Sequence, residues 1–400
     1  MQIPETTYNN ESEHLSGLLL EVNTAIITDA GSSDLLKLLE SVLYNRLKIG
    51  KAALISVQTE EGVLFSFGIS ESVLTSLNFQ DIIDSTEIKI NPDFKGKNYS
   101  ARILVPLFYG NKILAHLMLD NVPDHLTSNQ HLKFLQVVAS LLMTAIENKK
   151  WYQEFKKKTE FNKELELASH LQHMLFPELL PNDQRFQASA YFRPQQHLSG
   201  DYYDFIQTGE NEFVFCMADV SGKGVPAALL MSNFQASWRT LLGYCPDLMD
   251  LVRELNNKVN LTSRGEKFIT CFIGKYNTET RILTYVNAGH TAPVLFGGEN
   301  PLLLNVGCSG LGMLEQLKGI KQGYLTIPRD SFLLCYTDGL VELENEKGDQ
   351  FGVERLIELI KKIKKETPES INDKILRALK IHGGNEKFSD DIALLSCKLP

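Results

Sequence analysis

A long stretch without proline is the feature that most constrains this 400-residue chain. No proline occurs between Pro123 and Pro177, and apolar residues recur at three- and four-residue steps from Leu132 to Ile146. Because proline is the residue that most strongly ends a helix, the stretch predicts one long helix that starts near Thr127 and stops before Pro177. At roughly 150 residues per domain, the chain predicts two domains joined by this helix.

The two halves differ in their patterning. Before the long helix, apolar spacing predicts a helix pair over 15–48, and alternating runs predict strands over 52–58, 63–69, 101–110 and 112–121. After Pro177 the chain is richer in strands, and the fold class is α+β. We expect a first domain over 1–148, a helical linker over 149–178 and a second domain over 179–400. The elements predicted in the second domain are strands near 186–193, 213–220, 268–276, 281–287, 332–337 and 391–397, and helices near 225–242, 247–260, 352–364 and 369–381.

The linker carries an incomplete heptad pattern. Glu154, Lys158 and Gln172 fall on the same seam as its apolar residues and weaken the pattern. Two interpretations stay open: a parallel coiled coil that would form a homodimer, and a solvated helix that packs on its own domain. The apolar residues of the seam are Trp151, Phe161, Leu165, Ala168 and Leu175.

The charge balance argues against several classes of partner. The chain has 40 Lys and Arg residues against 49 Asp and Glu, a net charge of −9, and both halves are acidic. Because binding to nucleic acids and to anionic membranes depends on basic residues, we expect neither partner. The longest largely apolar run, 134–146, is shorter than the ~20 residues of a membrane-spanning helix, and the N-terminus lacks the pattern of a secretory signal. We therefore expect a cytoplasmic protein.

Acidic residues recur where apolar strands of the second domain end. Asp201, Asp219, Asp338 and Asp390 each lie beside glycine or another small or acidic residue. Taken singly, each is explained by a turn or by a helix cap. Taken together, they suit hard divalent cations, because two such ions need several carboxylates converging from different strands. All six cysteines lie after residue 215 without the close spacing of zinc ligands, so no other metal cluster competes.

This ligand set points to the hydrolysis of a phosphate ester. Two ions about 3.5–4 Å apart lower the pKa of a bridging water and bind phosphoryl oxygens. The segment 221–224, Ser-Gly-Lys-Gly, follows a strand as a nucleotide-binding loop would, but Gly224 stands where a Walker motif needs Ser or Thr. We expect its glycines to turn the backbone tightly beside a metal, with the next helix starting at Pro226.

Six motifs occur in order over about residues 160–400. They are ELELASHLQHMLFPELLP, SGDYYDF, MADVSGKGVPAALLM, FITCFIGKYNTETRILTYVNAGHTAP, LLCYTDGLVELEN and SDDIALL. In this order they resemble the bacterial sporulation and stress-response branch of the 2C-type (PPM) metal-dependent serine/threonine phosphatases. The resemblance implies an αββα sandwich for the second domain.

The same resemblance implies roles for individual residues. Asp219 would bridge two Mn²⁺ or Mg²⁺ ions, and the carbonyl of Val220 would complete one of them. Asp201 would ligate one ion, and Asp338 with Asp390 would ligate the other. Asp219 and Asp338 are thereby the expected catalytic residues, and no nucleophilic Ser or Cys is needed, because the metal site activates the attacking water.

Other positions match the family less directly. Asp204 and Asp391 are expected to support the ligands, and Asp391 stays open as the alternative to Asp390 as a ligand. Ser199 stands where the family usually has glycine, and the loop 308–312 lacks the family's common proline. Both departures alter loop shape, and neither removes a proposed ligand.

Several side chains have two interpretations each. His290 is either a proton donor to the leaving alkoxide or a structural histidine. Arg193 either contacts phosphate or is an exposed strand residue. The apolar residues after Gly224 are either core residues or, as the resemblance implies, a switch that completes the metal site. They are Val225, Leu229, Leu230 and Met231.

The first domain resembles, less specifically, the GAF sensory domains. The run ILVPLFYGNKILAHLMLDN, followed by a helix ending AIENKKWYQEF, is similar to the C-terminal half of that family, with Ala115 where a second glycine is frequent. No cysteine precedes Cys216, which excludes a thioether-linked bilin. The resemblance implies a sensor.

These features combine into a signalling phosphatase that removes phosphate from serine or threonine of a partner protein. The resemblance implies an anti-sigma-factor antagonist of the STAS type as the partner and regulation by the first domain. A catalytically silent adaptor is the alternative, although all four acidic positions are retained. A metal-dependent nuclease would use similar carboxylates, but it fits poorly with an acidic chain.

Overall fold

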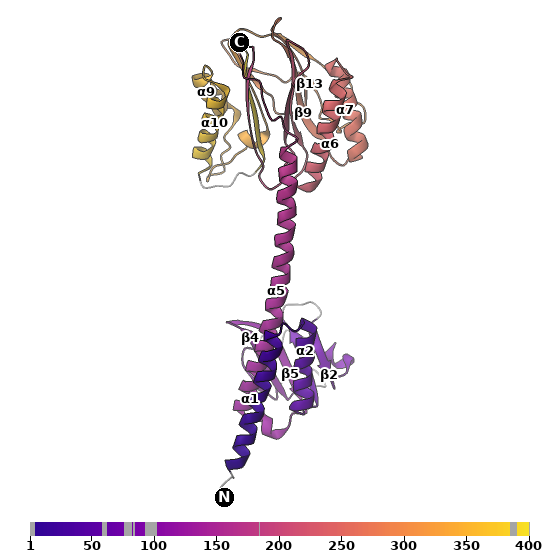
Figure 1. The fold of residues 1–400 in the computed structure, drawn as a ribbon, viewed down its shortest axis with the longest axis vertical. Helices are drawn as coiled ribbons and strands as arrows, with labels where there is room; N and C mark the ends of the chain where they lie inside the picture. The colour runs from indigo at the N-terminus through magenta and orange to yellow at the C-terminus, as the bar shows by residue number, and fades with distance from the viewer. Residues whose placement is uncertain are drawn as a thin grey trace. The chain divides into compact units, whose positions relative to one another are not determined.

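A computed structural model of the protein describes residues 5–57, 62–75, 82, 85–92, 102–183, 185–384 and 390–399. Residue 58 of the first expected strand, residue 101 of the third and Ser389 of the last motif lie outside these residues. The chain divides into two compact units, Met1–Glu160 and Phe161–Pro400. The division falls inside α5, a single helix from Asn129 to His173, so the predicted long helix is confirmed (Figure 1).

The first unit is an antiparallel sheet with α1, α2 and the first part of α5 on one face and the short α3 on the other. Its five strands are ordered β2-β1-β5-β4-β3. In β1, Ala52 and Leu54 face the helices, whereas Ala53 and Ile55 belong to a small cluster on the other face, as the two-residue period of a strand requires. The elements are α1 (Glu5–Ile27), α2 (Ser32–Ser41), the π-helical turn η1 (Val42–Arg46), β1 (Lys51–Ser56), β2 (Val63–Phe67), α3 (Glu71–Leu74), β3 (Lys89–Ile90), β4 (Ile103–Tyr109), β5 (Lys112–Asp120) and the 3₁₀ turn η2 (Asp124–Thr127).

The second unit contains two sheets. One has the order β13-β10-β9-β8-β7 with β14 paired to β10, and the other has the order β12-β11-β15-β16-β6. The strands are β6 (Gln187–Arg193), β7 (Tyr202–Gln207), β8 (Glu212–Val220), β9 (Ile269–Asn277), β10 (Ile282–Ala288), β11 (Val294–Phe296), β12 (Leu302–Leu303), β13 (Gly307–Cys308), β14 (Gly323–Thr326), β15 (Ser331–Tyr336) and β16 (Ile392–Leu399). The helices are α6 (Val225–Leu242), α7 (Leu248–Ser263), α8 (Asp338–Val341), α9 (Val353–Ile363) and α10 (Pro368–Gly383).

Three apolar layers hold the second unit together. Between the sheets, Phe215 of one sheet packs in a cluster with Leu333 and Leu395 of the other. Helices α6 and α7 cover the first sheet through residues such as Trp238, and α9 and α10 cover the second through residues such as Ile375 (Figure 1). The unit is therefore the expected αββα sandwich. Four of the six cysteines are buried in these layers, and none of the six is paired in a disulfide.

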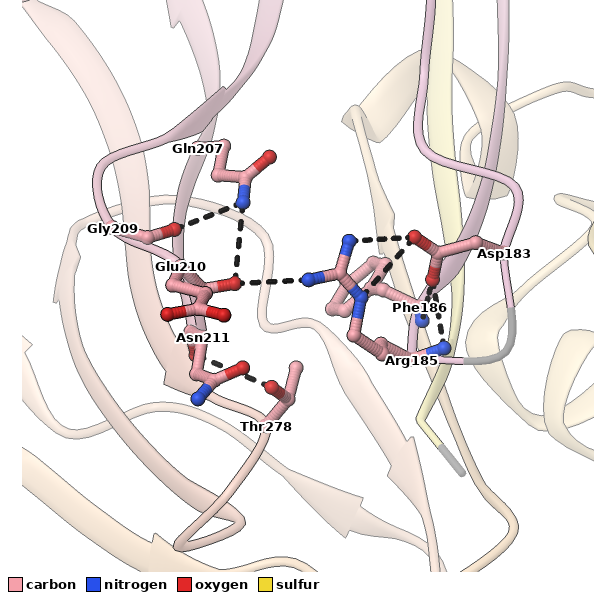
Figure 2. Close-up of polar contacts among 8 residues, drawn as sticks. All are labelled: Asp183, Arg185, Phe186, Gln207, Gly209, Glu210, Asn211 and Thr278. Carbon is pink, nitrogen blue, oxygen red and sulfur yellow. Dashed lines mark hydrogen bonds and ion pairs between the residues drawn. The ribbon is translucent and has the colours of Figure 1, made fainter.

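A polar cluster ties the two sheets at one end of the sandwich (Figure 2). Arg185, just before β6, bonds to the carboxylate of Asp183 and donates to the carbonyl of Glu210 at 3.1 Å. Gln207 donates to the same carbonyl at 3.2 Å, across the β7–β8 hairpin. Because β7 runs from 202 to 207, this cluster lies at the end opposite the predicted aspartates. The predicted aspartates lie at the other end of the two sheets.

Candidate active site

Strand register brings the predicted aspartates to one end of the sandwich. Tyr202 of β7 pairs with Ala218 of β8, so Asp201 and Asp219 follow on adjacent strands at the same end. In the other sheet the amide of Thr337 donates to the carbonyl of Ala393 at 3.0 Å. This bond joins the end of β15 to the start of β16. Asp338 at the start of α8 and Asp390 just before β16 therefore lie at the same end of that sheet.

The four carboxylates repel one another. Burial and then the charge of Asp219 raise the pKa of Asp201 well above its ordinary value. Burial and then the charges of Asp338 and Asp390 raise the pKa of Asp219 to about 7. Burial and then the charge of Asp390 also raise the pKa of Asp338. Carboxylates from both sheets thus influence one another, and a positive charge placed among them would relieve the repulsion.

This donor set fits hard divalent cations. The buried Oδ2 atom of Asp201 has no hydrogen-bond partner, although buried polar atoms normally have one. The Val220 carbonyl oxygen lies close to Asp201's neighbour Gly200: a Cβ atom on Gly200 would be only 2.9 Å from it. Carboxylates with a backbone carbonyl are the oxygen ligands that Mg²⁺ and Mn²⁺ take. Among the described residues no three His, Cys, Asp or Glu side chains already form a ligand set, so binding requires side-chain adjustment.

The loop 221–224 places the ammonium group of Lys223 beside this carboxylate cluster. The Lys223 ammonium lies 2.8 Å from Asp390 Oδ1 and donates to Gln195 Oε1 at 3.3 Å. Gly222 and Gly224 have φ of 87° and 72°, which favours glycine and agrees with the tight turn expected here. Helix α6 begins at Val225, one residue before the expected Pro226.

Comparison with known proteins identifies the second unit. Residues 209–400 match the family described as stage II sporulation protein E (SpoIIE). The matched residues make up most of the second unit. Phosphoserine phosphatase RsbU of Bacillus subtilis (strain 168) is 28% identical to the chain over 204 residues, which is 50% of this chain and 60% of RsbU.

Two further relatives agree with this assignment. Phosphoserine phosphatase RsbP of the same strain is 30% identical over 196 residues, covering 48% of this chain and 47% of RsbP. The chain thus spans less than two thirds of the length of both curated relatives. The SiaA-PP2C domain of Pseudomonas aeruginosa superposes with a TM-score of 0.54 at 17% identity, covering 61% of this chain and 99% of that domain. This likeness supports the 2C phosphatase fold.

Asp391 organises a loop of the second unit. Its Oδ1 accepts from the Gln195 amide at 2.7 Å. Its Oδ2 accepts from the Ser199 hydroxyl at 2.7 Å and from the Gly200 amide at 3.2 Å. Both oxygens of Asp391 are therefore engaged by this loop, which supports the position of Asp201. Ser199 uses its hydroxyl for this contact, which explains a side chain where the family usually has glycine.

Asp204 differs from the other matched aspartates in its hydrogen-bond partners. Its carboxylate accepts from the Tyr202 hydroxyl at 2.7 Å, from Trp238 Nε1 at 3.1 Å and from the Arg239 guanidinium at 2.8 and 3.1 Å. All three donors come from β7 or α6. Asp204 therefore joins the helix to the sheet and lies outside the carboxylate cluster.

His290 and Arg193 have contrasting environments. His290 is buried, its amide donates to Asn287 Oδ1 at 2.7 Å, and its Nδ1 lies 3.0 Å from Thr270 Oγ1. Burial lowers the pKa of His290 to about 4, so the ring is neutral near pH 7. These contacts favour the structural interpretation, although Thr270 pairs in register with Asp219. Arg193 is exposed at the end of β6.

The apolar residues after Gly224 separate into two groups. Leu230 and Met231 are buried in the layer between α6 and its sheet, so they are core residues. Val225 and Leu229 are 42% and 67% exposed. Of the four, these two are the ones whose exposure still permits the switch role implied by the resemblance.

Sequence reasoning missed two residues that support the site. Gln172 of α5 is buried: its amide donates to the Ser199 carbonyl at 2.9 Å and its Oε1 accepts from the Ser199 amide at 3.1 Å. The sequence did not single it out, because Glu154 and Lys158 are polar residues on the same seam. Thr337 is fully buried, and its hydroxyl hydrogen-bonds to Asp201, which opposes the rise in that pKa. No pattern in the sequence distinguishes it.

Proposed function

We propose that the protein is a metal-dependent protein serine/threonine phosphatase in bacterial signalling. The observation that carries this proposal is the convergence of strand-end aspartates from both sheets, one of them with a buried and unpartnered oxygen. Such a cluster is costly to stability unless cations occupy it, which is typical of a functional site. The names of RsbU and RsbP, phosphoserine phosphatases, agree with this activity.

Each residue of the site has a defined role in this proposal. Asp201, Asp219 and the Val220 carbonyl would hold one Mn²⁺ or Mg²⁺ ion, and Asp219, Asp338 and Asp390 would hold the other. When bound, the ions supply a water of lowered pKa and positive charge for the phosphoryl oxygens.

Three surrounding residues position this set. Thr337 and Asp391 keep Asp201 in place, the first by its bond to the carboxylate and the second through the loop before it. Lys223, which pairs with Asp390, gives up that contact when an ion takes the carboxylate.

The partner and the regulation complete the proposal. The substrate is a regulatory phosphoprotein, such as a STAS-type anti-sigma-factor antagonist in the cytoplasm. Residues 1–148 act as a GAF-like sensor, 149–178 as the linker and 179–400 as the phosphatase. Trp151, Phe155 and Phe161 of α5 are 56–71% exposed, which supports a homodimer through the linker. Within the described residues, no helix has the length and apolarity needed to cross a bilayer.

Phosphate release tests the activity. The full chain is assayed on p-nitrophenyl phosphate and on a phosphoserine peptide with Mn²⁺, with Mg²⁺ and with EDTA. We expect turnover that needs the metal and is lost in Asp219→Asn and Asp338→Asn. A difference in rate between the full chain and residues 161–400 would establish regulation by the first unit. No turnover with any divalent ion, together with retained binding of a phosphoprotein, would indicate the silent adaptor instead.

A further inference from the structure

A cavity lies next to the loop that is held by Asp391. It has a volume of about 630 Å³ and lies between the end of β6 and the C-terminal half of α10. Its wall includes Arg193 and Gln195 from the chain after β6, and Leu376, Leu379 and Lys380 from α10. None of the roles assigned above uses this cavity.

The cavity combines two cations with an apolar floor. Arg193 and Lys380 are exposed, while Leu379 is fully buried beneath them. Tyr191 and Leu376, both half-buried, extend the apolar part of the wall. None of the described residues that line it is acidic, although the chain as a whole carries a charge of −9. A surface of this kind is complementary to a peptide that presents an acidic residue beside an apolar one.

One residue connects the cavity to the site. Gln195 lines the cavity, its amide donates to Asp391 Oδ1 at 2.7 Å, and its Oε1 accepts from Lys223. Lys223 in turn pairs with Asp390. A polypeptide whose phosphorylated residue enters the metal site must pass over neighbouring surface, and each residue of an extended chain adds about 3.3–3.6 Å of reach. Residues a few positions from the phosphoserine therefore reach the cavity.

We propose that this cavity binds an acidic segment of the phosphoprotein substrate, next to the phosphorylated residue, with Arg193 and Lys380 as its specificity-determining residues. The inference rests on the proposed function for its substrate class. It adds a selectivity that a small phosphate ester does not experience, because such an ester has no flanking residues.

Peptide selectivity tests the proposal. Three phosphoserine peptides carry Glu, Ala or Lys at the flanking positions and are otherwise identical. The full chain with Mn²⁺ is measured for kcat/KM on each peptide, and for Kd by fluorescence anisotropy with labelled peptides. We expect the Glu peptide to be favoured over the Lys peptide by about five-fold in both quantities, since two partly exposed ion pairs contribute modestly. Raising the salt concentration reduces this ratio.

Variants that change the charge of Lys380 or Arg193 test whether the peptide selectivity arises in the cavity. In Lys380→Glu the ratio of Glu to Lys peptide falls to about one or inverts, and Arg193→Gln lowers it in the same direction. Lys362→Glu changes the same charge on an exposed residue of α9 that does not line the cavity, so it keeps the native ratio apart from a small general effect. Because each variant is judged by a ratio, a general loss of activity does not affect the result.

The outcomes separate this inference from the proposed function. Equal kcat/KM for the three peptides, or equal changes in Lys380→Glu and Lys362→Glu, overturns the cavity as a specificity site. Selective binding of the Glu peptide without turnover of any phosphate ester supports the cavity and overturns the phosphatase.

Discussion

Asp201 lies just before β7 and Asp204 lies within it, and the two are 2% and 0% exposed, yet their surroundings are opposite. Asp204 accepts hydrogen bonds from Tyr202, Trp238 and Arg239, including a guanidinium charge. Asp201 has an unpartnered oxygen and faces other carboxylates. Burial alone therefore does not distinguish the two. What distinguishes them is whether the structure compensates the buried charge, and an uncompensated carboxylate indicates a ligand site.

Replacing Asp201 gives the largest expected effect. Asp201→Asn removes a proposed ligand, and we expect phosphate release to fall by about 10³-fold, or about 4 kcal/mol. Its stability without metal should be unchanged or higher, because one repelling charge is gone. The measurements are phosphate release with Mn²⁺ and urea unfolding in EDTA. Asp373→Asn, on the exposed face of α10, is the control. Activity within a few-fold of the native chain would remove Asp201 from the ligand set.

Replacing Asp204 should give the converse result. Asp204→Asn leaves Arg239 and Trp238 without their charged acceptor and should lower the free energy of unfolding of the second unit by about 3 kcal/mol. The molecules that stay folded should keep most of their phosphate release. Urea unfolding followed by circular dichroism measures the loss in this variant and in the next.

Trp238→Phe removes one hydrogen bond to the same carboxylate and should cost about 1 kcal/mol. An Asp204 variant that is stable but inactive would show that Asp204 also acts in the active site. The distinction between Asp201 and Asp204 would then be wrong.

His290 is a buried base that can be compared with the two buried aspartates. Burial lowers its folded-state pKa to about 4, whereas the unfolded value is about 6.5. Below pH 6.5 the unfolded chain binds a proton at His290 that the folded chain does not, so the contribution of His290 to stability falls as pH decreases from 6.5 towards 4, by about 2 kcal/mol at pH 5. The raised pKa of Asp219 gives a contribution of opposite sign, because the folded chain binds that proton first.

Unfolding free energies in EDTA between pH 7 and pH 5 measure this slope. We expect His290→Gln to become more stable relative to the native chain as the pH falls, and His170→Gln, on the exposed part of α5, to keep the native pH dependence. An unchanged slope in His290→Gln would show that this ring is protonated in the folded protein.

The ion pair between Lys223 and Asp390 gives the smallest expected effect. Both side chains are partly exposed, at 48% and 39%, so the pair is worth under about 1 kcal/mol. Because the ammonium competes with an ion for Asp390, Lys223→Gln should bind Mn²⁺ about two- to three-fold more tightly in calorimetric titration. Lys361→Gln on α9 is the control. Weaker binding would show that Lys223 stabilises the ligand arrangement.

The elements with strong periodicity were predictable. The long helix and strands such as β8 and β15 have unbroken apolar patterns, and the structure places them within a few residues of the expected bounds. Strands β11 to β14 have two to four residues each and were missed, because so short a segment has no measurable period. Strand β7 was missed because its polar residues, Asp204 among them, hide the alternation.

The candidate site was predictable to the level of its acidic residues. Aspartates beside glycine at strand ends carry a local signal, and Asp201, Asp219, Asp338 and Asp390 interact in the structure as that signal implies. The supporting contacts were not predictable. Gln172 reaches Ser199 across 27 positions, and Ser199 reaches Asp391 across 192, so both depend on how the sheets pack.

The close approach of Gly200 to the Val220 carbonyl has a consequence for evolution. A side chain at position 200 would need a Cβ atom 2.9 Å from that oxygen and 3.3 Å from the Val220 side chain, so the two loops would have to separate. A homologue could therefore lose catalysis through this one position while all four aspartates stay in its sequence. Counting acidic residues would classify such a descendant as an active enzyme. The residue at position 200 would reveal it as a degenerate paralogue.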